Sequence, residues 1–191
     1  PNQSLRIVFL NHQGFAADSS TKEGKAKDDS IRAFIKNNNI NVKLLAENNI
    51  HWKSVAPQER LEERTSTWFN GLHMSNTYYK NFQPDGKQRF GGCSAWCIEE
   101  TAYRVIQSGE DETGLGRWAW SLLRGTDSIK LRVIAAYRPV RSSSGATTVW
   151  NQQHTYFLEK GEGTCPRILF NEHLTAAIKT WCEEGDQIIL G

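Results

Sequence analysis

The sequence contains no apolar run that approaches the ~20 residues needed to cross a bilayer as a helix. Its first twenty residues also lack the basic start and the small-residue cleavage site of a signal peptide. Both absences argue against a membrane protein and against export directed by this segment. We therefore expect a soluble chain with no membrane partner.

Net charge is also small. Lysine and arginine number 23, aspartate and glutamate number 21, and the formal charge at pH 7 is +2. Composition alone therefore indicates neither a nucleic-acid partner nor a membrane surface. Any basic surface has to be a local cluster of side chains.

Cysteine is too sparse for a disulfide framework. The four cysteines also lack the paired C-x-x-C spacing of zinc ligands; they are Cys93, Cys97, Cys165 and Cys182. We expect them to be reduced and mostly buried, with a redox pair of Cys93 and Cys97 as the alternative.

What the chain does contain is enough apolar material for one layered domain. Its 191 residues are long enough to bury a full core between two or more layers, so we expect a single domain over residues 1–191. Most of the seven tryptophans should pack in that core.

Residues 130–140 (KLRVIAAYRPV) give the strand pattern around which the rest is organised. From Val133 onward both alternating faces are apolar, which is typical of an interior strand covered on both sides. Pro139 cannot donate a hydrogen bond within a sheet, so the strand should end near Tyr137. We expect the Tyr137 hydroxyl at the carboxyl rim, meaning the end of the sheets at which such strands finish.

Two earlier strands end in polar residues of interest. Residues 5–10 lead to Asn11, and residues 42–46 lead to Glu47. The segment between them has helical periodicity over residues 26–38, and a strand, helix and strand in this order make the two strands parallel. Asn11 and Glu47 should therefore lie at the same rim, where ligands of open α/β sheets gather.

The remaining segments alternate strand and helix patterns. We expect a strand at the end of the chain, over residues 187–190, and a meander of antiparallel strands that makes the sheet mixed. The meander strands are expected over residues 93–98, 102–107 and 117–123, after a turn-rich stretch at 70–92. Further helices are expected over residues 58–69, 149–158 and 167–184.

The strand-end residues suggest metal chemistry. Carboxylate and amide oxygens are the ligands that Mg²⁺ or Mn²⁺ prefers, so Glu47 and Asn11 could hold such an ion beside a substrate phosphate. The alternative is that both residues only mark strand ends where the backbone meets water.

Tyr137 and two arginines could complete such a site. The Tyr137 hydroxyl could donate a hydrogen bond to a phosphate oxygen or assist proton transfer. Arg138 and Arg141 could bind phosphates through their guanidinium groups. The alternatives are a half-buried ring with a solvated hydroxyl and two ordinary surface charges.

Several segments together resemble one family, in order and approximate spacing. They are LRIVFLNHQG, VKLLAENNIHW, FGGCSAW, GLGRWAW, LRVIAAYRPV and the stretch from VWNQQHTYFL to EEGDQIILG. This combination is similar to the endonuclease/exonuclease/phosphatase superfamily, in particular its retroelement-like DNA endonuclease domains. The resemblance implies a four-layer α/β sandwich with two mixed sheets between helices, and metal-dependent phosphodiester hydrolysis.

The resemblance also assigns roles to residues. Asn11 and Glu47 match the metal-site residues of the family, and Tyr137 matches its active-site tyrosine. Gln13 stands where the family often has an acidic residue. The chain ends at Gly191, before the family's Gly-Asp-x-Asn and Ser-Asp-His motifs. On this likeness we expect a truncated domain that lacks its carboxyl-terminal third.

The resulting hypothesis is the amino-terminal part of a Mg²⁺- or Mn²⁺-dependent hydrolase, active if the missing motifs are supplied, with DNA favoured over RNA as substrate. One alternative is an inactive domain of the same fold, in which a protein partner pairs with the open last strand. Another is a phosphatase that acts on a small molecule or lipid.

Overall fold

The computed structural model describes residues 4–11, 14–80, 90–142, 145 and 148–191. In this part of the chain eight strands form two four-stranded sheets. The first sheet has the order β1-β2-β4-β3, with strands Ile7–Asn11, Val42–Ala46, Cys93–Ile98 and Leu72–Thr77. The second has the order β5-β6-β7-β8, with strands Val105–Glu110, Trp118–Arg124, Lys130–Ala136 and Asp186–Leu190.

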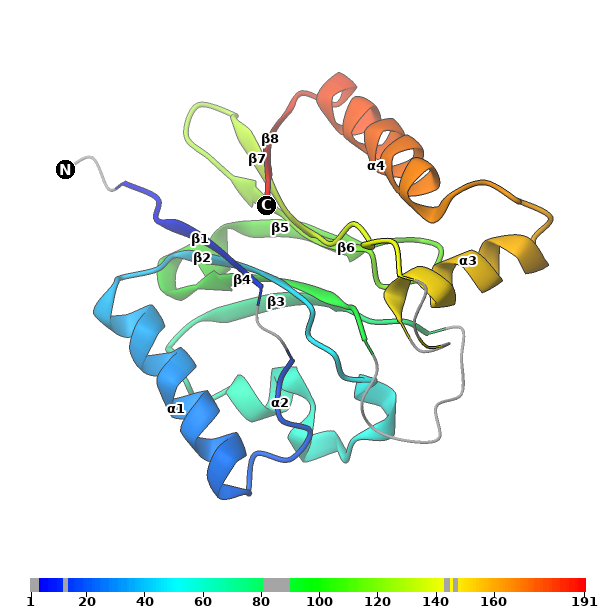
Figure 1. Cartoon of the computed structure of the whole chain (residues 1–191). Helices are drawn as coiled ribbons and strands as arrows, with labels where there is room; N and C mark the ends of the chain where they lie inside the picture. The colour runs from blue at the N-terminus through cyan, green and yellow to red at the C-terminus, as the bar shows by residue number, and fades with distance from the viewer. Residues whose placement is uncertain (1–3, 12–13, 81–89, 143–144, 146–147) are drawn as a thin grey trace.

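The two sheets stack face to face and helices cover their outer faces (Figure 1). The first sheet is covered by α1 (Lys22–Asn37) and α2 (Leu61–Thr65), and the second by α4 (Pro166–Glu183). The helix α3 (Val149–Glu159) lies at one end of the sandwich. Short 3-10 helices span Trp52–Ser54, Pro57–Glu59 and Glu99–Arg104. This is the predicted four-layer sandwich.

Each sheet is mixed, as expected. The pairs β1–β2 and β7–β8 are parallel, and the pairs β2–β4, β3–β4, β5–β6 and β6–β7 are antiparallel. The antiparallel meander is confirmed for β5, β6 and β7. It does not include residues 93–98, because β4 lies in the first sheet between β2 and β3.

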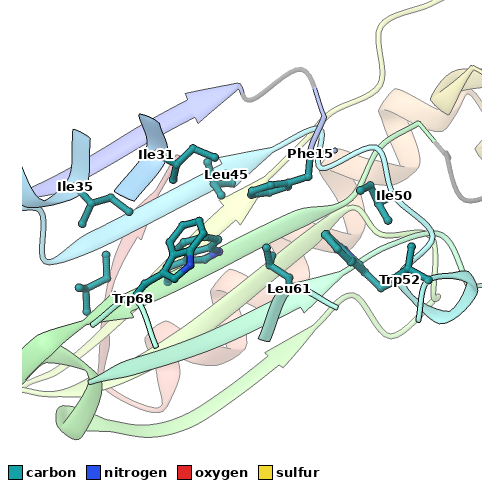
Figure 2. Close-up of a cluster of buried hydrophobic side chains, with 11 residues drawn as sticks. Phe15, Ile31, Ile35, Leu45, Ile50, Trp52, Leu61 and Trp68 are labelled. Carbon is teal, nitrogen blue, oxygen red and sulfur yellow. The ribbon is translucent and has the colours of Figure 1, made fainter. Parts of the chain in front are cut away.

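Three apolar layers hold the sandwich together. Phe15, Trp68 and Trp96 belong to the layer between the first sheet and its helices, where Figure 2 shows the aromatic rings gathered against the sheet. A second layer of small and branched residues fills the space between the sheets. A third packs α4 on the second sheet. Five of the seven tryptophans are buried, which confirms their expected role; they are Trp52, Trp68, Trp96, Trp118 and Trp120.

Several predicted boundaries were wrong for local reasons. The first helix begins at Lys22 rather than residue 26, because Thr21 caps it: its side-chain oxygen accepts a hydrogen bond from the Gly24 amide at 3.0 Å. The expected helix over residues 58–69 is reduced to a 3-10 turn and the five residues of α2.

Two strands, β3 and β5, also differ from expectation. The stretch expected as turns contains β3, and the strand expected over residues 102–107 begins only at Val105, after a 3-10 helix. Cys93 and Cys97 are buried free thiols, as expected, whereas Cys182 is exposed. No helix in the described part of the chain is both long enough and apolar enough to span a membrane.

Candidate active site

Asn11 and Glu47 come together at the carboxyl rim of the first sheet, as predicted. β1 and β2 are in parallel register, with Asn11 opposite Ala46, and Glu47 is the next residue. Ile7 packs in the layer between the sheets. Asn11, four positions further along the strand, therefore faces the same side. Gln13 lies outside the described residues.

Tyr137 reaches the same rim from the second sheet. It follows β7 directly, and its backbone amide donates to the Arg117 carbonyl at 2.8 Å. Its ring packs against the layer between the sheets, half-buried. The Tyr137 hydroxyl forms a side-chain hydrogen bond with Glu47. Glu47 of the first sheet and Tyr137 of the second sheet therefore meet across the space between the sheets.

This contact favours the protonated form of the Tyr137 hydroxyl. Burial raises the pKa of Tyr137, and the hydrogen bond and negative charge of Glu47 raise it further. The phenol is therefore protonated at neutral pH and donates to the Glu47 carboxylate. It can serve as a hydrogen-bond donor, and it cannot serve as an anion or a base at that pH.

The backbone at Glu47 is in an unusual conformation. Glu47 has φ of +58° and Asn49 has φ of +57°, in the left-handed region that costs a non-glycine residue about 1–2 kcal/mol. Backbone hydrogen bonds fasten this turn: the Gly14 amide donates to the Glu47 carbonyl at 2.8 Å, and the Asn49 amide donates to the Gly91 carbonyl at 2.8 Å. The turn therefore joins the β1 loop to the start of β4.

A buried ion pair lies near the rim. Arg117 donates to both carboxylate oxygens of Asp111, at 2.7 and 2.8 Å, and the side chains of both are 1% exposed. Burial raises the pKa of the neighbouring Cys93 thiol, and the charges of Asp111 and Glu47 raise it further. Cys93 is therefore a protonated core thiol and not a nucleophile.

Arg138 and Arg141 are both exposed, but Arg138 does not share the face of Tyr137. Arg138 lines a groove of about 370 Å³ together with Phe170 and Leu174 of α4. It therefore lies on the outer side of the second sheet, whereas Tyr137 lies on the inner side. A phosphate that contacts both residues would have to cross the end of β7.

The donor set at the rim suits a hard cation. One carboxylate from Glu47 and one amide oxygen from Asn11 are the kind of ligands that Mg²⁺ takes together with water and a substrate phosphate. Among the described residues, no group of three or more His, Cys, Asp or Glu side chains is placed to hold a metal ion. A cation here would therefore complete its shell with water or substrate.

Sequence reasoning missed the polar residues that support the rim. Asn48, Ser94 and Asn76 form a hydrogen-bonded group directly beside Glu47. Asn48 follows a strand-end residue and could have been noticed for that reason. Ser94 and Asn76 carried no signal, because only the sheet pairing brings them together.

Comparisons with known proteins agree on the fold. No model of a protein family matches the sequence, and no curated protein matches it. Among solved structures, AP endonuclease LMAP from Leishmania major is 14% identical with a TM-score of 0.52, over 83% of this chain and 47% of that chain.

Two other structures are similar at lower scores. The human Nocturnin catalytic domain with bound sulfate is 11% identical with a TM-score of 0.47, over 83% of this chain and 60% of that chain. An endonuclease/exonuclease/phosphatase family protein from Leptotrichia buccalis is 13% identical with a TM-score of 0.44, over 82% and 63%. This chain thus spans 47% to 63% of the length of these three structures. The chain therefore shares its four-layer α/β fold with AP endonuclease LMAP.

Proposed function

We propose that the chain is part of a Mg²⁺-dependent phosphodiesterase and that its substrate is DNA, cut internally. The observation that carries this proposal is that Glu47 and Tyr137 meet at one rim beside Asn11, each following a strand of a different sheet. The two residues lie 90 positions apart in the sequence, and both are partly exposed.

Glu47 and Asn11 are the residues that would hold Mg²⁺ or Mn²⁺. Such an ion, when bound, stabilises the negative charge that develops on a phosphoryl oxygen during hydrolysis. Glu47 contributes the charge, and its fixed turn keeps the carboxylate at the rim. Asn11 contributes a neutral oxygen that costs no further charge repulsion.

Tyr137 supplies the protonated donor. Its hydroxyl proton, held by Glu47 in the free protein, is available to a phosphate oxygen once substrate occupies the rim. Arg138 and Arg141 would bind phosphates on either side of the cut bond, Arg138 from the outer side of β7. DNA as the substrate class follows the family resemblance and the AP endonuclease LMAP among the similar structures.

The test is nicking of supercoiled plasmid by the purified chain in Mg²⁺. We expect Glu47→Gln to lower the rate by about 10²-fold or more, because it removes the charge that holds the ion. Tyr137→Phe should lower kcat by about 10²-fold, because it removes one donor to the developing charge. EDTA should abolish nicking by the unaltered chain.

Matched controls are present in the chain. Glu99 also follows a strand of the first sheet and also has a positive φ, of +53°, but it lies at the opposite end of the sandwich from Glu47. Tyr103 is exposed and far from the rim. Glu99→Gln and Tyr103→Phe should nick at the unaltered rate. Equal nicking by Glu47→Gln and the unaltered chain would mean a contaminating nuclease and would overturn the assignment.

A further inference from the structure

The direction of the Glu47 side chain is not the one that strand geometry supplies. In β2, Leu45 points outward to the helix layer, and Val42 and Leu44 point into the space between the sheets. Continued alternation would turn Glu47 outward, like Leu45. Its carboxylate instead reaches Tyr137 of the second sheet. The left-handed φ of +58° at Glu47 makes this reversal.

Asn48 occupies the outward position that Glu47 has left. It is 0% exposed, and its side-chain amide nitrogen donates to the Ser94 hydroxyl at 2.6 Å and to the Asn76 amide oxygen at 3.1 Å. The Ser94 hydroxyl donates to the same Asn76 oxygen at 2.9 Å. Ser94 and Asn76 belong to β4 and β3, so the group joins the turn to two strands of the sheet.

The backbone of Asn48 is also fully engaged. Its amide donates to the Gly92 carbonyl at 3.2 Å, and its carbonyl accepts from the Phe15 amide at 2.9 Å. Rotation of the Glu47–Asn48 peptide back to ordinary strand geometry would break the bond from the Asn48 amide to Gly92 and the bond from the Gly14 amide to the Glu47 carbonyl. It would also place a charged carboxylate in the apolar layer that contains Leu45 and Phe15.

Asn48 is not simply a well-satisfied core residue. Its side-chain oxygen is buried and has no hydrogen-bond partner among the described residues. A buried polar oxygen without a partner lowers stability, so this half of the amide does not stabilise the fold. The donor half of the amide is the part that the turn uses.

We propose that Asn48, held by Ser94 and Asn76, is the positioning residue that keeps Glu47 turned toward Tyr137. The inference rests on the proposed function of Glu47 and Tyr137. Asn48 touches neither substrate nor metal; it fixes the turn that presents the Glu47 carboxylate. Loss of the Asn48 group should therefore release Glu47 before it unfolds the domain.

The direct test needs no metal and no substrate. Tyrosine labelled with ¹³C at Cζ, the ring carbon that carries the hydroxyl, gives one NMR resonance for each of the five tyrosines, and Tyr137→Phe assigns that of Tyr137. Glu47→Ala gives the chemical shift of the Tyr137 resonance in the absence of the hydrogen bond. We expect Ser94→Ala to move the Tyr137 resonance toward that position, and Asn48→Ala to move it further.

Ser75→Ala is the matched control. Ser75 lies on β3, and its hydroxyl donates to the Gly109 carbonyl at 2.6 Å, but on the face between the sheets and away from Asn48. It should leave the Tyr137 resonance in place. An unmoved resonance in Ser94→Ala, or an equal movement in Ser75→Ala, would overturn the inference. Ser94→Ala decides alone if Asn48→Ala fails to fold.

Activity separates the inference from the function on which it rests. We expect Ser94→Ala to lower kcat about tenfold with KM changed less than about twofold, the loss expected when one hydrogen bond that orders the catalytic carboxylate is removed. Ser75→Ala should keep the unaltered kcat. If the chain hydrolyses no phosphodiester, the proposed function is wrong. The Tyr137 resonance still decides whether Asn48 positions Glu47.

Discussion

The two outer faces of the sandwich bury a positive charge in opposite ways. Under α4, Arg132 of β7 is 1% exposed and donates twice to Asp186, at 2.9 and 2.6 Å. Its guanidinium lies 4.0 Å from the ring centre of Trp120 and 4.4 Å from that of Trp181. Here the charge has both a counter-charge and two aromatic faces.

Under α1, Lys43 of β2 is equally buried, at 1% exposure. Its ammonium lies 5.0 Å from the centre of a Trp96 ring. No carboxylate in the described part of the chain forms an ion pair with it. Among the residues that the structure describes, Lys43 therefore has an aromatic contact and no counter-charge.

The difference shows in the pKa values. Burial lowers the pKa of Lys43 to about 7. Burial by itself would raise the pKa of Asp186, but hydrogen bonds from Lys130 and Arg132 outweigh it and lower that pKa. A guanidinium cannot lose its proton, so Arg132 needs a carboxylate, whereas Lys43 can become neutral.

The largest expected effect comes from removal of the counter-charge of Arg132. We expect Asp186→Asn to lower the free energy of unfolding by about 3–5 kcal/mol, because it leaves the buried guanidinium with only the more distant and exposed Glu184 carboxylate, at 3.8 Å. Urea denaturation measures it. Asp127→Asn, in an exposed turn, is the control and should change stability by less than about 0.5 kcal/mol. A loss below about 1 kcal/mol for Asp186→Asn would contradict the pairing.

Low pH should lower the stability of the fold by protonating the same carboxylate, Asp186. Because the folded pKa of Asp186 is below its unfolded value, its contribution is complete above about pH 4 and is lost as the pH falls through the folded pKa. The stability difference between the unaltered chain and Asp186→Asn should therefore shrink below about pH 4. A constant difference over that range would argue against a charged Asp186.

The next effect concerns Lys43, whose pH dependence has the same sign as that of Asp186 but falls at higher pH. Its folded pKa of about 7 lies below the unfolded value, so the unfolded chain binds more protons between these values and stability rises with pH. From pH 7 to pH 9 the gain should be about 2 kcal/mol. Lys43→Met should be more stable at pH 7 and should lack this gain.

Lys53→Met is the control for Lys43→Met, because Lys53 is exposed. It should keep the pH dependence of the unaltered chain. Denaturation curves at several pH values between 6 and 9 would measure both variants. If Lys43→Met follows the same pH curve as the unaltered chain, Lys43 is charged in the folded state and the comparison fails.

The smallest effect is expected at an exposed pair. Lys80 and Glu110 form an ion pair with side chains 41% and 31% exposed. Glu110→Gln should lower stability by at most about 1 kcal/mol, since water and salt screen the pair. Denaturation in low and high salt should show that even this small loss disappears in high salt. A loss of stability comparable to that of Asp186→Asn would mean that solvent exposure does not determine how much an ion pair contributes to stability.

Much of the fold could be predicted because its strands carry strong patterns. β7 is apolar on both faces, and the helix between β1 and β2 made those strands parallel. Elements with weak patterns were missed. β3 reads LHMSNT, without clear alternation, and becomes a strand only because β4 supplies its hydrogen bonds. Residues 102–104, predicted as the start of a strand, are instead the end of the 3-10 helix Glu99–Arg104.

The site was predictable only in part. Asn11 and Glu47 follow from parallel strands, because their rim is a consequence of local topology. The contact between Glu47 and Tyr137 depends on how two sheets stack and on a left-handed residue, neither of which a strand pattern contains. Strand alternation did predict that Arg138 lies on the opposite face from Tyr137, and the structure shows that this is the face under α4.

The most direct test of the proposed site is an anomalous-difference map from crystals of the chain soaked in Mn²⁺. We expect a peak within coordination distance of the Glu47 carboxylate and the Asn11 amide oxygen, absent from Glu47→Gln crystals and present in Glu99→Gln crystals. A map without a peak at that rim, or a peak that persists in Glu47→Gln, would contradict it.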